Sequence, residues 1–355
     1  MILFSDDACF VNKKKYKDQL LKDITEKGLL TYLKKYIPKY NKPSHDIIVN
    51  IGDDCFIGKI PQNRYIVITS DVLVEDVHFS FRWCTPEALG YKLLAANISD
   101  LSSMGNVEPS YGIVCIGCKE TLPIDMFKGI YSSLVKTANN YNIKLIGGDT
   151  VRSEKLFLSL TLVGFVRKNE YITRSGANIG DKIFHVGYLG LSGAGLKILE
   201  SNSIENKIIF KKYHNLITTH LRPKIYLKEG QILGKYHLAT ACIDTSDGLY
   251  RSVKFLTEAS DTGAEIYLDK IPVHRELILF SKEYKVNIYD YILYGGEDYG
   301  LLFTAKENDI DKLNKFFPKI KYIGEIVDNR AGIKVLCGNK EYKITHNGYD
   351  AFERQ

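Results

Sequence analysis

The chain has 355 residues, of which 45% are hydrophobic and 25% are charged, and its formal net charge at pH 7 is +6. This length and composition are typical of a soluble globular protein with two domains. The charge permits an anionic ligand, but it falls short of the clustered basic face of a nucleic-acid-binding protein. We therefore expect neither nucleic acid nor a membrane among the partners.

The first part of the chain, residues 1–43, combines many lysines with helix-forming residues, which predicts a basic and helical N-terminal segment. No apolar stretch is long enough to span a bilayer, and the N-terminus lacks the apolar centre of a signal peptide. Seven cysteines are scattered along the sequence, which argues against a disulfide framework and predicts a cytoplasmic protein.

Short β-branched runs alternate with helical stretches, a pattern that predicts an α/β or α+β fold. After a strand at 64–71, a helix is expected to begin at Pro86 with Thr85 as its N-cap. Further strands are expected at 111–117, 144–149, 156–166, 181–187, 239–247, 264–269 and 299–305.

A polar, glycine-bearing stretch between 168 and 180 predicts a domain boundary. It would separate an N-terminal domain of residues 44–168 from a C-terminal domain of residues 177–355.

Aspartates beside Gly, Ser or Thr recur at the expected strand ends and helix junctions. They are Asp53, Asp54, Asp71, Asp100, Asp149, Asp244 and Asp247. One such aspartate alone is more often a turn residue than a ligand, and the adjacent pair Asp53 and Asp54 also fits a turn. Repeated carboxylates beside small polar residues, however, suit Mg²⁺, which a few carboxylates hold together with substrate phosphates. The sequence therefore predicts a metal and phosphate site assembled from separate parts of the chain.

The glycine run at 190–195 has the glycine spacing of a P-loop, but Leu196 stands where the lysine is required. We expect a strand-to-helix turn there, and anion binding at the helix N-terminus is the other interpretation.

Eight sequence motifs, in order, resemble those of the thiamine-monophosphate kinase family, part of the superfamily that includes aminoimidazole ribonucleotide synthetase. They are IGDDC, TSDVLVEDVHF, NISDLSSMG, LIGGDTVRS, TRSGANIGD, LRPKIYLKEGQIL, IDTSDGL and GGEDYGLLFT. The resemblance begins near residue 50 and extends to the terminal NGYDAF.

The resemblance implies two α/β domains. The first, residues 44–168, would bind the metal and ATP and join its sheet to that of a second copy in a homodimer. It implies transfer of the γ-phosphoryl group of ATP to thiamine monophosphate, giving thiamine diphosphate and ADP, with several Mg²⁺ ions. No general base is expected, because the acceptor phosphate has a second pKa of about 6 and is already ionised. The alternatives are another ATP-using enzyme of the superfamily, of the selenophosphate synthetase or cyclo-ligase type, and a non-catalytic nucleotide-binding module.

The same resemblance implies three groups of site residues. The expected metal ligands are Asp54, Thr69, Ser70, Asp71, Asp100, Asp149, Asp244 and Asp247. The expected ATP contacts are Tyr131, Gly148, Asp149, Arg174 and Ser246. The expected contacts with thiamine monophosphate are His78, Glu297 and Tyr349. The chain departs from the family at Lys224, where arginine is usual, and at Gly300, where an acid is common. Neither position is an expected ligand.

Overall fold

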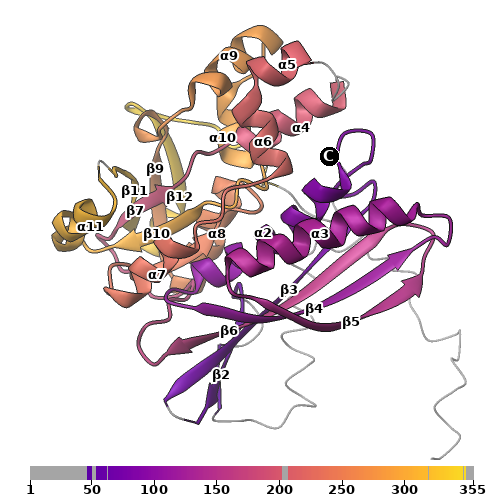
Figure 1. Cartoon of the computed structure of the whole chain (residues 1–355). Coiled ribbons are helices and arrows are strands. Elements are labelled where there is room, and N and C mark those ends of the chain that lie inside the picture. The colour runs from indigo at the N-terminus through magenta and orange to yellow at the C-terminus, as the bar shows by residue number, and fades with distance from the viewer. Residues whose placement is uncertain are drawn as a thin grey trace, which may run out of the picture. The chain divides into compact units, whose positions relative to one another are not determined.

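The computed structural model of the chain describes residues 46–49, 53–61, 63–201, 207–318, 320–346 and 348. The basic segment expected at residues 1–43 and the expected substrate contact Tyr349 lie outside these ranges. Within them the strands form two sheets, and helices accompany each sheet (Figure 1). No helix of this part of the chain is long and apolar enough to cross a membrane.

The first sheet has six strands in the spatial order β1-β2-β3-β6-β4-β5. Their bounds are β1 Ile47–Val49, β2 Phe56–Ile60, β3 Arg64–Val74, β4 Glu108–Cys118, β5 Lys144–Arg152 and β6 Phe157–Arg167. Neighbouring strands are antiparallel except β4 and β5, which are parallel and are connected through helix α3 (Ile124–Asn140). A parallel pair needs such a crossover, because the chain must return to the same end of the sheet.

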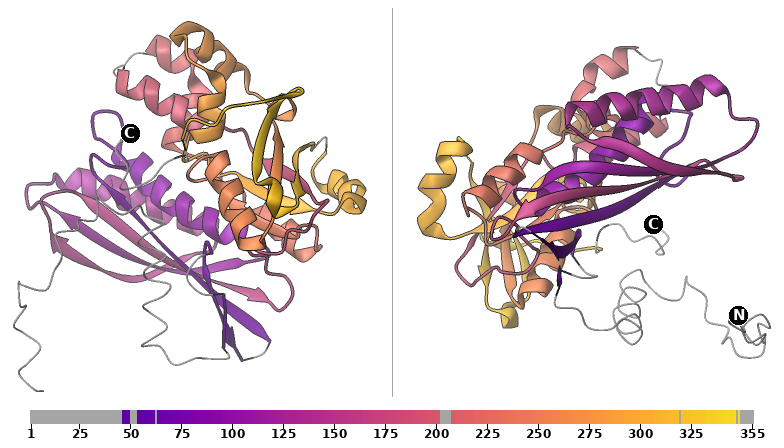
Figure 2. Two further views of the ribbon diagram at one scale, coloured as in Figure 1. Left: turned by 180° about the vertical axis from the view of Figure 1, so that it is seen from behind. Right: turned by 60° about the horizontal axis from the view of Figure 1, so that its bottom comes forward.

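Helices α2 (Pro86–Ser103) and α3 lie on one face of this sheet (Figures 1 and 2). Side chains alternate along each strand, so the inward residues of β6 are buried and its outward residues are only half-buried. None of the helices that the structure describes covers the outward face. Large apolar side chains exposed on that face are Val72, Tyr111, Ile113 and Val151.

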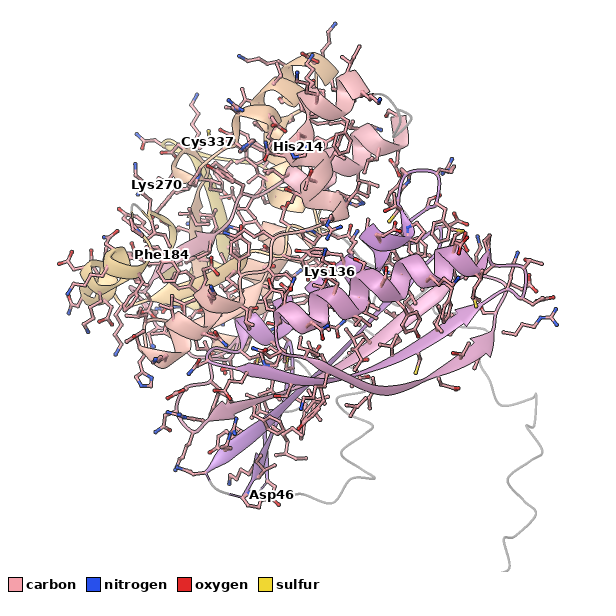
Figure 3. The ribbon with its side chains drawn as sticks, viewed as in Figure 1. Asp46, Lys136, Phe184, His214, Lys270 and Cys337 are labelled. Carbon is pink, nitrogen blue, oxygen red and sulfur yellow. The ribbon has the colours of Figure 1, made fainter. Side chains whose placement is uncertain are left out.

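The second sheet has seven strands in the order β13-β12-β9-β11-β7-β10-β8. Their bounds are β7 Lys182–Val186, β8 Ala241–Asp244, β9 Gly263–Tyr267, β10 Leu301–Ala305, β11 Tyr322–Val327, β12 Ile333–Cys337 and β13 Lys340–Glu341. Only β9 and β12 are parallel neighbours among these strands. Phe184 of β7, labelled in Figure 3, stacks on Phe303 of β10 with ring centroids 5.3 Å apart, and both rings are fully buried.

The helices that accompany the second sheet all belong to the second half of the sequence. Their bounds are α4 Leu191–Ser201, α5 Lys207–Lys212, α6 His214–Leu221, α7 Leu227–Lys235, α8 Leu249–Ser260, α9 Arg275–Tyr284, α10 Ile288–Tyr294 and α11 Ile310–Phe316. Short 3₁₀ turns occur at Leu268–Lys270, Glu307–Asp309 and Asn329–Ala331.

Helix α2 is buried on almost all sides. It packs against β3 and β6 of the first sheet and against α3, and it also contacts α6, α7 and β8 from the second half of the chain. Thr85 caps its N-terminus, because the Thr85 side chain accepts a hydrogen bond from the backbone N–H of Ala88 at 3.2 Å. The predicted cap and the predicted first residue, Pro86, are therefore confirmed, and α2 is the element shared by the two halves.

The predicted α/β architecture is confirmed, and each strand expected from the sequence overlaps a strand of the structure. The sequence reasoning missed β1, β2, β11, β12 and β13. The two shortest of these, β1 and β13, lie at the edges of their sheets, where a strand pairs with only one neighbour.

Candidate active site

Three of the expected metal ligands meet in one place. Asp54, Asp100 and Asp244 each offer a carboxylate oxygen, and these three oxygens lie within 4.8 Å of one another. Asp54 lies just before β2, Asp100 lies in α2 and Asp244 ends β8, so both halves of the chain contribute. Buried carboxylates this close repel one another strongly unless a cation or protons intervene. Their hard oxygen donors fit a divalent cation such as Mg²⁺.

Hydroxyl groups orient these carboxylates. Each carboxylate accepts a hydrogen bond from one hydroxyl, and the donors are Ser103 for Asp54, Thr69 for Asp100 and Ser99 for Asp244. The two serine bonds are 2.7 Å long. Partners of this kind fix the direction in which a ligand oxygen points.

Burial and mutual repulsion change the acidity of these carboxyl groups. Burial, followed by repulsion from neighbouring aspartates, raises the pKa of Asp100 and of Asp244 well above the ordinary range. Burial, with Asp54 as the second cause, raises the pKa of Asp71 to about 6. Asp71 therefore faces the same group, which we call the acidic cluster: Asp54, Asp71, Asp100 and Asp244.

Arg174 supplies positive charge to this cluster. Its Nε donates a hydrogen bond to Asp54 Oδ1 at 3.1 Å, and its terminal nitrogen forms an ion pair with the same oxygen. Its backbone N–H donates to Asp53 Oδ2 at 3.0 Å, and Asp53 Oδ1 accepts from the backbone N–H of Asp54 at 2.9 Å. The two adjacent aspartates thus differ in role, because Asp53 binds backbone groups while Asp54 joins the cluster.

Two expected metal ligands, Ser70 and Asp149, lie on the face of the first sheet that is opposite to helix α2. Ser70 lies opposite Thr161 of β6, with the two hydroxyl oxygens 3.1 Å apart. Asp149 is exposed on β5 and accepts a hydrogen bond from the backbone N–H of Thr150 at 2.8 Å. Strand alternation places both side chains away from α2, whereas Thr69 and Asp71 point towards it. The described part of one chain does not bring Ser70 or Asp149 to the acidic cluster.

Gly148 lies against the backbone of β4, and Asp247 lies beside an arginine. A Cβ atom at Gly148 would lie 1.7 Å from the backbone oxygen of Val114, so only glycine fits there. Asp247 lies in the turn between β8 and α8, where its Oδ2 is 3.4 Å from Arg251 Nε. The neighbouring Ser246 accepts a hydrogen bond at its backbone oxygen from the N–H of Glu297 at 2.6 Å.

Glu297 lies in a second polar cluster, which sequence reasoning found only in part. Glu297 Oε1 is 2.8 Å from Lys92 Nζ, and Glu297 Oε2 is 3.4 Å from His220 Nδ1. His220 Nδ1 is also 3.0 Å from Ser192 Oγ. We call these four residues the Glu297 cluster: Lys92, Ser192, His220 and Glu297. Lys92, Ser192 and His220 had no predicted role. A helical wheel could have indicated Lys92, because it precedes Ser99 by two turns of one helix.

The charges of the Glu297 cluster nearly cancel. Burial lowers the pKa of His220 to about 3, with the charge of Lys92 as the second cause, so this imidazole is neutral. Burial works to raise the pKa of Glu297, but attraction to the charge of Lys92 opposes it, and the pKa falls below its usual value. A carboxylate and an ammonium therefore form a neutral pair.

The expected substrate contact His78 lies close enough to Lys92 and Glu297 for their charges to affect its pKa. Its Nδ1 accepts a hydrogen bond from the backbone N–H of Val74 at 3.1 Å. Burial lowers the pKa of His78, and the opposing charges of Glu297 and Lys92 have smaller effects. The neutral ring therefore carries its proton on Nε2 and can donate one hydrogen bond from that atom.

The backbone around Glu297 is held against the turn that follows β8. Glu297 and Tyr299 have positive φ angles of 60° and 51°, which non-glycine residues rarely adopt. The N–H of Tyr299 donates to the backbone oxygen of Thr245 at 3.0 Å, and the N–H of Glu297 donates to that of Ser246. These bonds tie the expected acceptor contact to the turn between Asp244 and Asp247.

The departure from the family at Gly300 has a local reason. A Cβ atom at position 300 would lie 2.5 Å from His185 Cε1 and 2.5 Å from the backbone oxygen of Val186. His185 Nδ1 donates to the backbone oxygen of Gly187 at 3.1 Å, so its Nε2 accepts from the Thr245 hydroxyl at 3.1 Å. The buried ring of His185 thus fills the space that an acid at position 300 would need. Lys224, the other departure, lies 3.6 Å from Glu229 and is largely exposed.

The glycine run at 190–195 begins helix α4, as the turn interpretation predicted. The buried carboxylate of Asp298 accepts hydrogen bonds from the backbone N–H groups of Gly190 at 2.6 Å and Ser192 at 2.9 Å. Burial raises the pKa of Asp298 to about 7, although these bonds oppose the shift. The protein's own carboxylate therefore occupies the position that a phosphate would take at this helix N-terminus.

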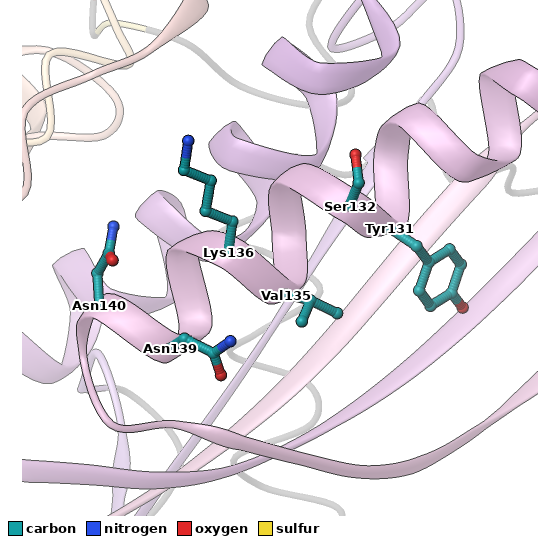
Figure 4. Close-up of a pocket in the computed structure, with 6 residues that line it drawn as sticks. All are labelled: Tyr131, Ser132, Val135, Lys136, Asn139 and Asn140. Carbon is teal, nitrogen blue, oxygen red and sulfur yellow. The ribbon is translucent and has the colours of Figure 1, made fainter.

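A shallow hollow of about 600 Å³ runs along α3 and involves the expected ATP contact Tyr131 (Figure 4). It is lined by Tyr131, Ser132, Val135, Lys136, Asn139 and Asn140. Tyr131 and Val135 extend to the opposite side of the helix from Lys136. The Tyr131 ring stacks on Phe127, with centroids 4.7 Å apart. No member of the acidic cluster lines this hollow.

Comparison with known proteins identifies the relatives of the chain. Its residues 52–166 match the AIR synthase related protein, N-terminal domain, and residues 178–335 match the C-terminal domain of the same family. The thiamine-monophosphate kinase of Buchnera aphidicola subsp. Acyrthosiphon pisum is 37% identical over 325 residues, covering 90% of this chain and 98% of the relative. The enzyme of that name from Escherichia coli K12 is 33% identical, covering 92% and 98%.

A solved structure has a similar fold. The complex described as "AaThiL complexed with AMPPCP and TMP" superposes with a TM-score of 0.81 at 30% sequence identity. The superposition covers 95% of this chain and 99% of that one.

Proposed function

Because the chain belongs to the thiamine-monophosphate kinase family, we propose that it transfers the γ-phosphoryl group of ATP directly to thiamine monophosphate at a site holding several Mg²⁺ ions. Family membership makes it an ATP-dependent kinase of thiamine monophosphate. The in-line mechanism and the metals are the proposal. The observation that carries them is the convergence of Asp54, Asp100 and Asp244 within 4.8 Å.

The acceptor needs no general base in this mechanism. A phosphate monoester has a second pKa of about 6, so its oxygens are ionised near neutral pH. The obstacle is charge, because two polyanions must approach within bonding distance. When bound, Mg²⁺ would offset this charge and favour the in-line arrangement of the phosphates. The oxygen donors of Asp54, Asp100 and Asp244, each oriented by a hydroxyl, fit such ions.

The remaining metal and nucleotide roles are proposed from the sequence resemblance, and the structure adds observations for only some of them. Asp71 faces the acidic cluster and completes it, while Asp53 supports the backbone of Asp54 and Arg174. The guanidinium of Arg174 already lies against Asp54, where it can share its charge with a phosphate. For ATP we propose contacts with Tyr131, Gly148, Asp149, Arg174 and Ser246. From the sequence resemblance we also propose Thr69, Ser70, Asp149 and Asp247 as metal ligands, of which Ser70 and Asp149 lie on the face of the first sheet away from the acidic cluster.

Glu297 and His78 are proposed to orient the acceptor. The two side chains interact electrostatically, and His78 Nε2 remains able to donate a hydrogen bond. Their contribution would be positioning of the acceptor rather than proton transfer. Tyr349 is proposed as a third acceptor contact from the sequence resemblance alone.

The direct test is product analysis. The purified protein is incubated with ATP, Mg²⁺ and either thiamine monophosphate or thiamine. We expect thiamine diphosphate and ADP from the phosphorylated acceptor. We expect very little product from thiamine, whose hydroxyl would have to lose a proton without a base. Release of ADP without thiamine diphosphate would favour another reaction of the superfamily. Efficient phosphorylation of thiamine would contradict the base-free mechanism.

We further propose that the outward face of the first sheet pairs with a second copy of the chain. The exposed Val72, Tyr111, Ile113 and Val151 form an apolar surface on that face, which a partner sheet would cover. Asp149 lies on the same face, so dimerisation would also bury its surroundings.

Sedimentation at micromolar concentration tests the dimer. We expect a dimer for the wild type and a monomer for Ile113→Lys. The matched control Ile278→Lys changes an equally exposed isoleucine on α9 and should leave the dimer intact. A monomeric wild type, including one whose face is covered by its own N-terminal segment, would overturn this assembly.

A further inference from the structure

Lys92 is a buried cation that the proposed mechanism does not use. It lies in α2, only 2% of its side chain is exposed, and its Nζ is 2.8 Å from Glu297 Oε1. Glu297 comes from the segment between α10 and β10, so the pair joins elements far apart in the sequence.

Burying such an ion pair costs free energy. Removing an ammonium and a carboxylate from water costs several kcal/mol per ion, and replacing a buried pair with apolar residues is often neutral or stabilising. Stability alone is therefore a poor explanation for Lys92. A role that depends on a charged Glu297 explains it better.

The surroundings of Glu297 show how it is constrained. Lys92 approaches one carboxylate oxygen, and His220, which is bonded to Ser192, approaches the other. Other titratable groups near it, among the residues that the structure describes, are His78, Cys84, Asp298 and Tyr299. On the backbone side, the N–H of Glu297 is bonded to the carbonyl of Ser246 in a left-handed conformation.

Exposure separates Glu297 from the residues that hold it. Its side chain is 24% exposed, whereas the side chains of Lys92 and His220 are 2% and 1% exposed, and Ser192 is fully buried. Of these four residues, only Glu297 can therefore present an atom to a bound molecule.

We propose that Lys92 is a positioning residue for the acceptor, which acts through the Glu297 carboxylate and does not touch the acceptor itself. This rests on the proposed function, in which Glu297 contacts thiamine monophosphate. The lysine keeps the carboxylate charged and directs it, so that acceptor binding depends on Lys92 while nucleotide binding does not.

The test is a double-mutant cycle between Lys92→Met and Glu297→Gln, with steady-state kinetics for thiamine monophosphate and a separate ATP-binding titration. Lys92→Met should raise the KM for thiamine monophosphate by about tenfold or more and leave ATP affinity within about twofold. In the Glu297→Gln background, the same change should add no further increase in KM, because no charged carboxylate remains to be directed.

The double variant also guards against misfolding. Lys92→Met alone leaves a buried carboxylate without its partner, but removing both charges avoids that penalty. The matched control is Lys182→Met, which breaks an ion pair of similar length, 2.7 Å to Glu325, in the second sheet. It should leave the KM for thiamine monophosphate unchanged.

Each result is decisive. A wild type that makes no thiamine diphosphate would overturn the proposed function and this inference together. An active wild type with an unchanged KM in Lys92→Met would overturn the inference alone. So would a Lys92→Met effect of the same size in the Glu297→Gln background, because it would show that Lys92 acts independently of Glu297.

Discussion

The acidic cluster and the Glu297 cluster place buried carboxylates in opposite electrostatic situations. In the acidic cluster four aspartates share the guanidinium of Arg174, and burial with mutual repulsion raises the pKa of Asp71, Asp100 and Asp244. In the Glu297 cluster one carboxylate meets one ammonium, and its pKa is lowered. The first cluster is deficient in positive charge and the second is balanced.

The difference suggests how one protein can handle two anionic substrates. A charge-deficient cluster gains free energy when cations enter, so it is suited to recruit metal ions and the phosphates that accompany them. A balanced cluster gains little from an added ion, but it holds its carboxylate in a fixed direction. We therefore assign metal binding to the first cluster and orientation of the acceptor to the second.

The largest effect should follow from changing a charge in the acidic cluster. Asp71→Asn should lower kcat by about a thousandfold or more, because an amide cannot replace a carboxylate where phosphate charge must be offset. Circular dichroism should show an intact fold. Asp328→Asn, which removes a carboxylate near β12, serves as the control and should keep normal turnover. Near-normal turnover of Asp71→Asn, or activity in the presence of a metal chelator, would contradict the proposal that the acidic cluster binds Mg²⁺.

Variants of the acceptor contacts should have a smaller and more selective effect. Glu297→Ala and His78→Ala should each raise the KM for thiamine monophosphate by about ten- to a hundredfold. Each variant would remove one proposed hydrogen bond to the acceptor, and the bond from Glu297 involves a charged group. ATP affinity, measured by titration, should stay close to that of the wild type. Equal losses of ATP affinity in both variants would mean that the two clusters do not divide the substrates as proposed.

The stability of the metal-free protein should depend on pH. The pKa of Asp71 is about 6 in the folded protein. An unfolded aspartate has a pKa of about 3.9. The folded state therefore binds protons more tightly, and its stability should fall as pH rises from about 4 to about 6, by about 2 kcal/mol for this group.

Denaturant titrations in chelator between these pH values measure this slope. Added Mg²⁺ should flatten it, and so should Asp71→Asn, because neither the metal-bound site nor the amide takes up the proton. A slope unchanged in Asp71→Asn would show that the pKa of this carboxyl group is not raised in the folded protein.

The smallest effect is expected outside both clusters. Lys224 is 67% exposed and pairs with Glu229, so Lys224→Arg, which introduces the residue usual in the family, should change activity by less than about twofold. Kinetics of this variant, measured beside the wild type, provide the comparison. A large gain in activity would mean that this surface contributes to the site.

The acidic cluster could be predicted because its aspartates stand in short motifs with Gly, Ser or Thr, although Asp71 lies inside β3 and Asp100 inside α2 rather than at a strand end or helix junction. The same reasoning failed at Lys92 and His220. A lysine in a helix is usually exposed, and only the packing of α2 against elements from both halves of the chain buries this one. His220 looked like one histidine among eight, because its partners Ser192 and Glu297 are distant in the sequence.

The positions of Ser70 and Asp149 also exceeded what the sequence could predict. Strand alternation alone separates Ser70 from Thr69 and Asp71, but the direction of Asp149 depends on the irregular register between β4 and β5. A bulge of one residue decides which face a side chain occupies, and nothing in the local sequence marks it.

Helix α2 fixes the distance between the two clusters. Lys92 contacts the Glu297 carboxylate, and Ser99, Asp100 and Ser103 on the following turns contact or belong to the acidic cluster. Seven residues of α-helix span about 10 Å, so the separation of the two clusters is set by the rise of one rigid rod. One residue inserted between Lys92 and Ser99 would add little length but would turn one cluster by about 100° relative to the other. The distance between the proposed metal site and the proposed acceptor site therefore depends on the number of helical residues between them, and rearranging surface loops cannot change it.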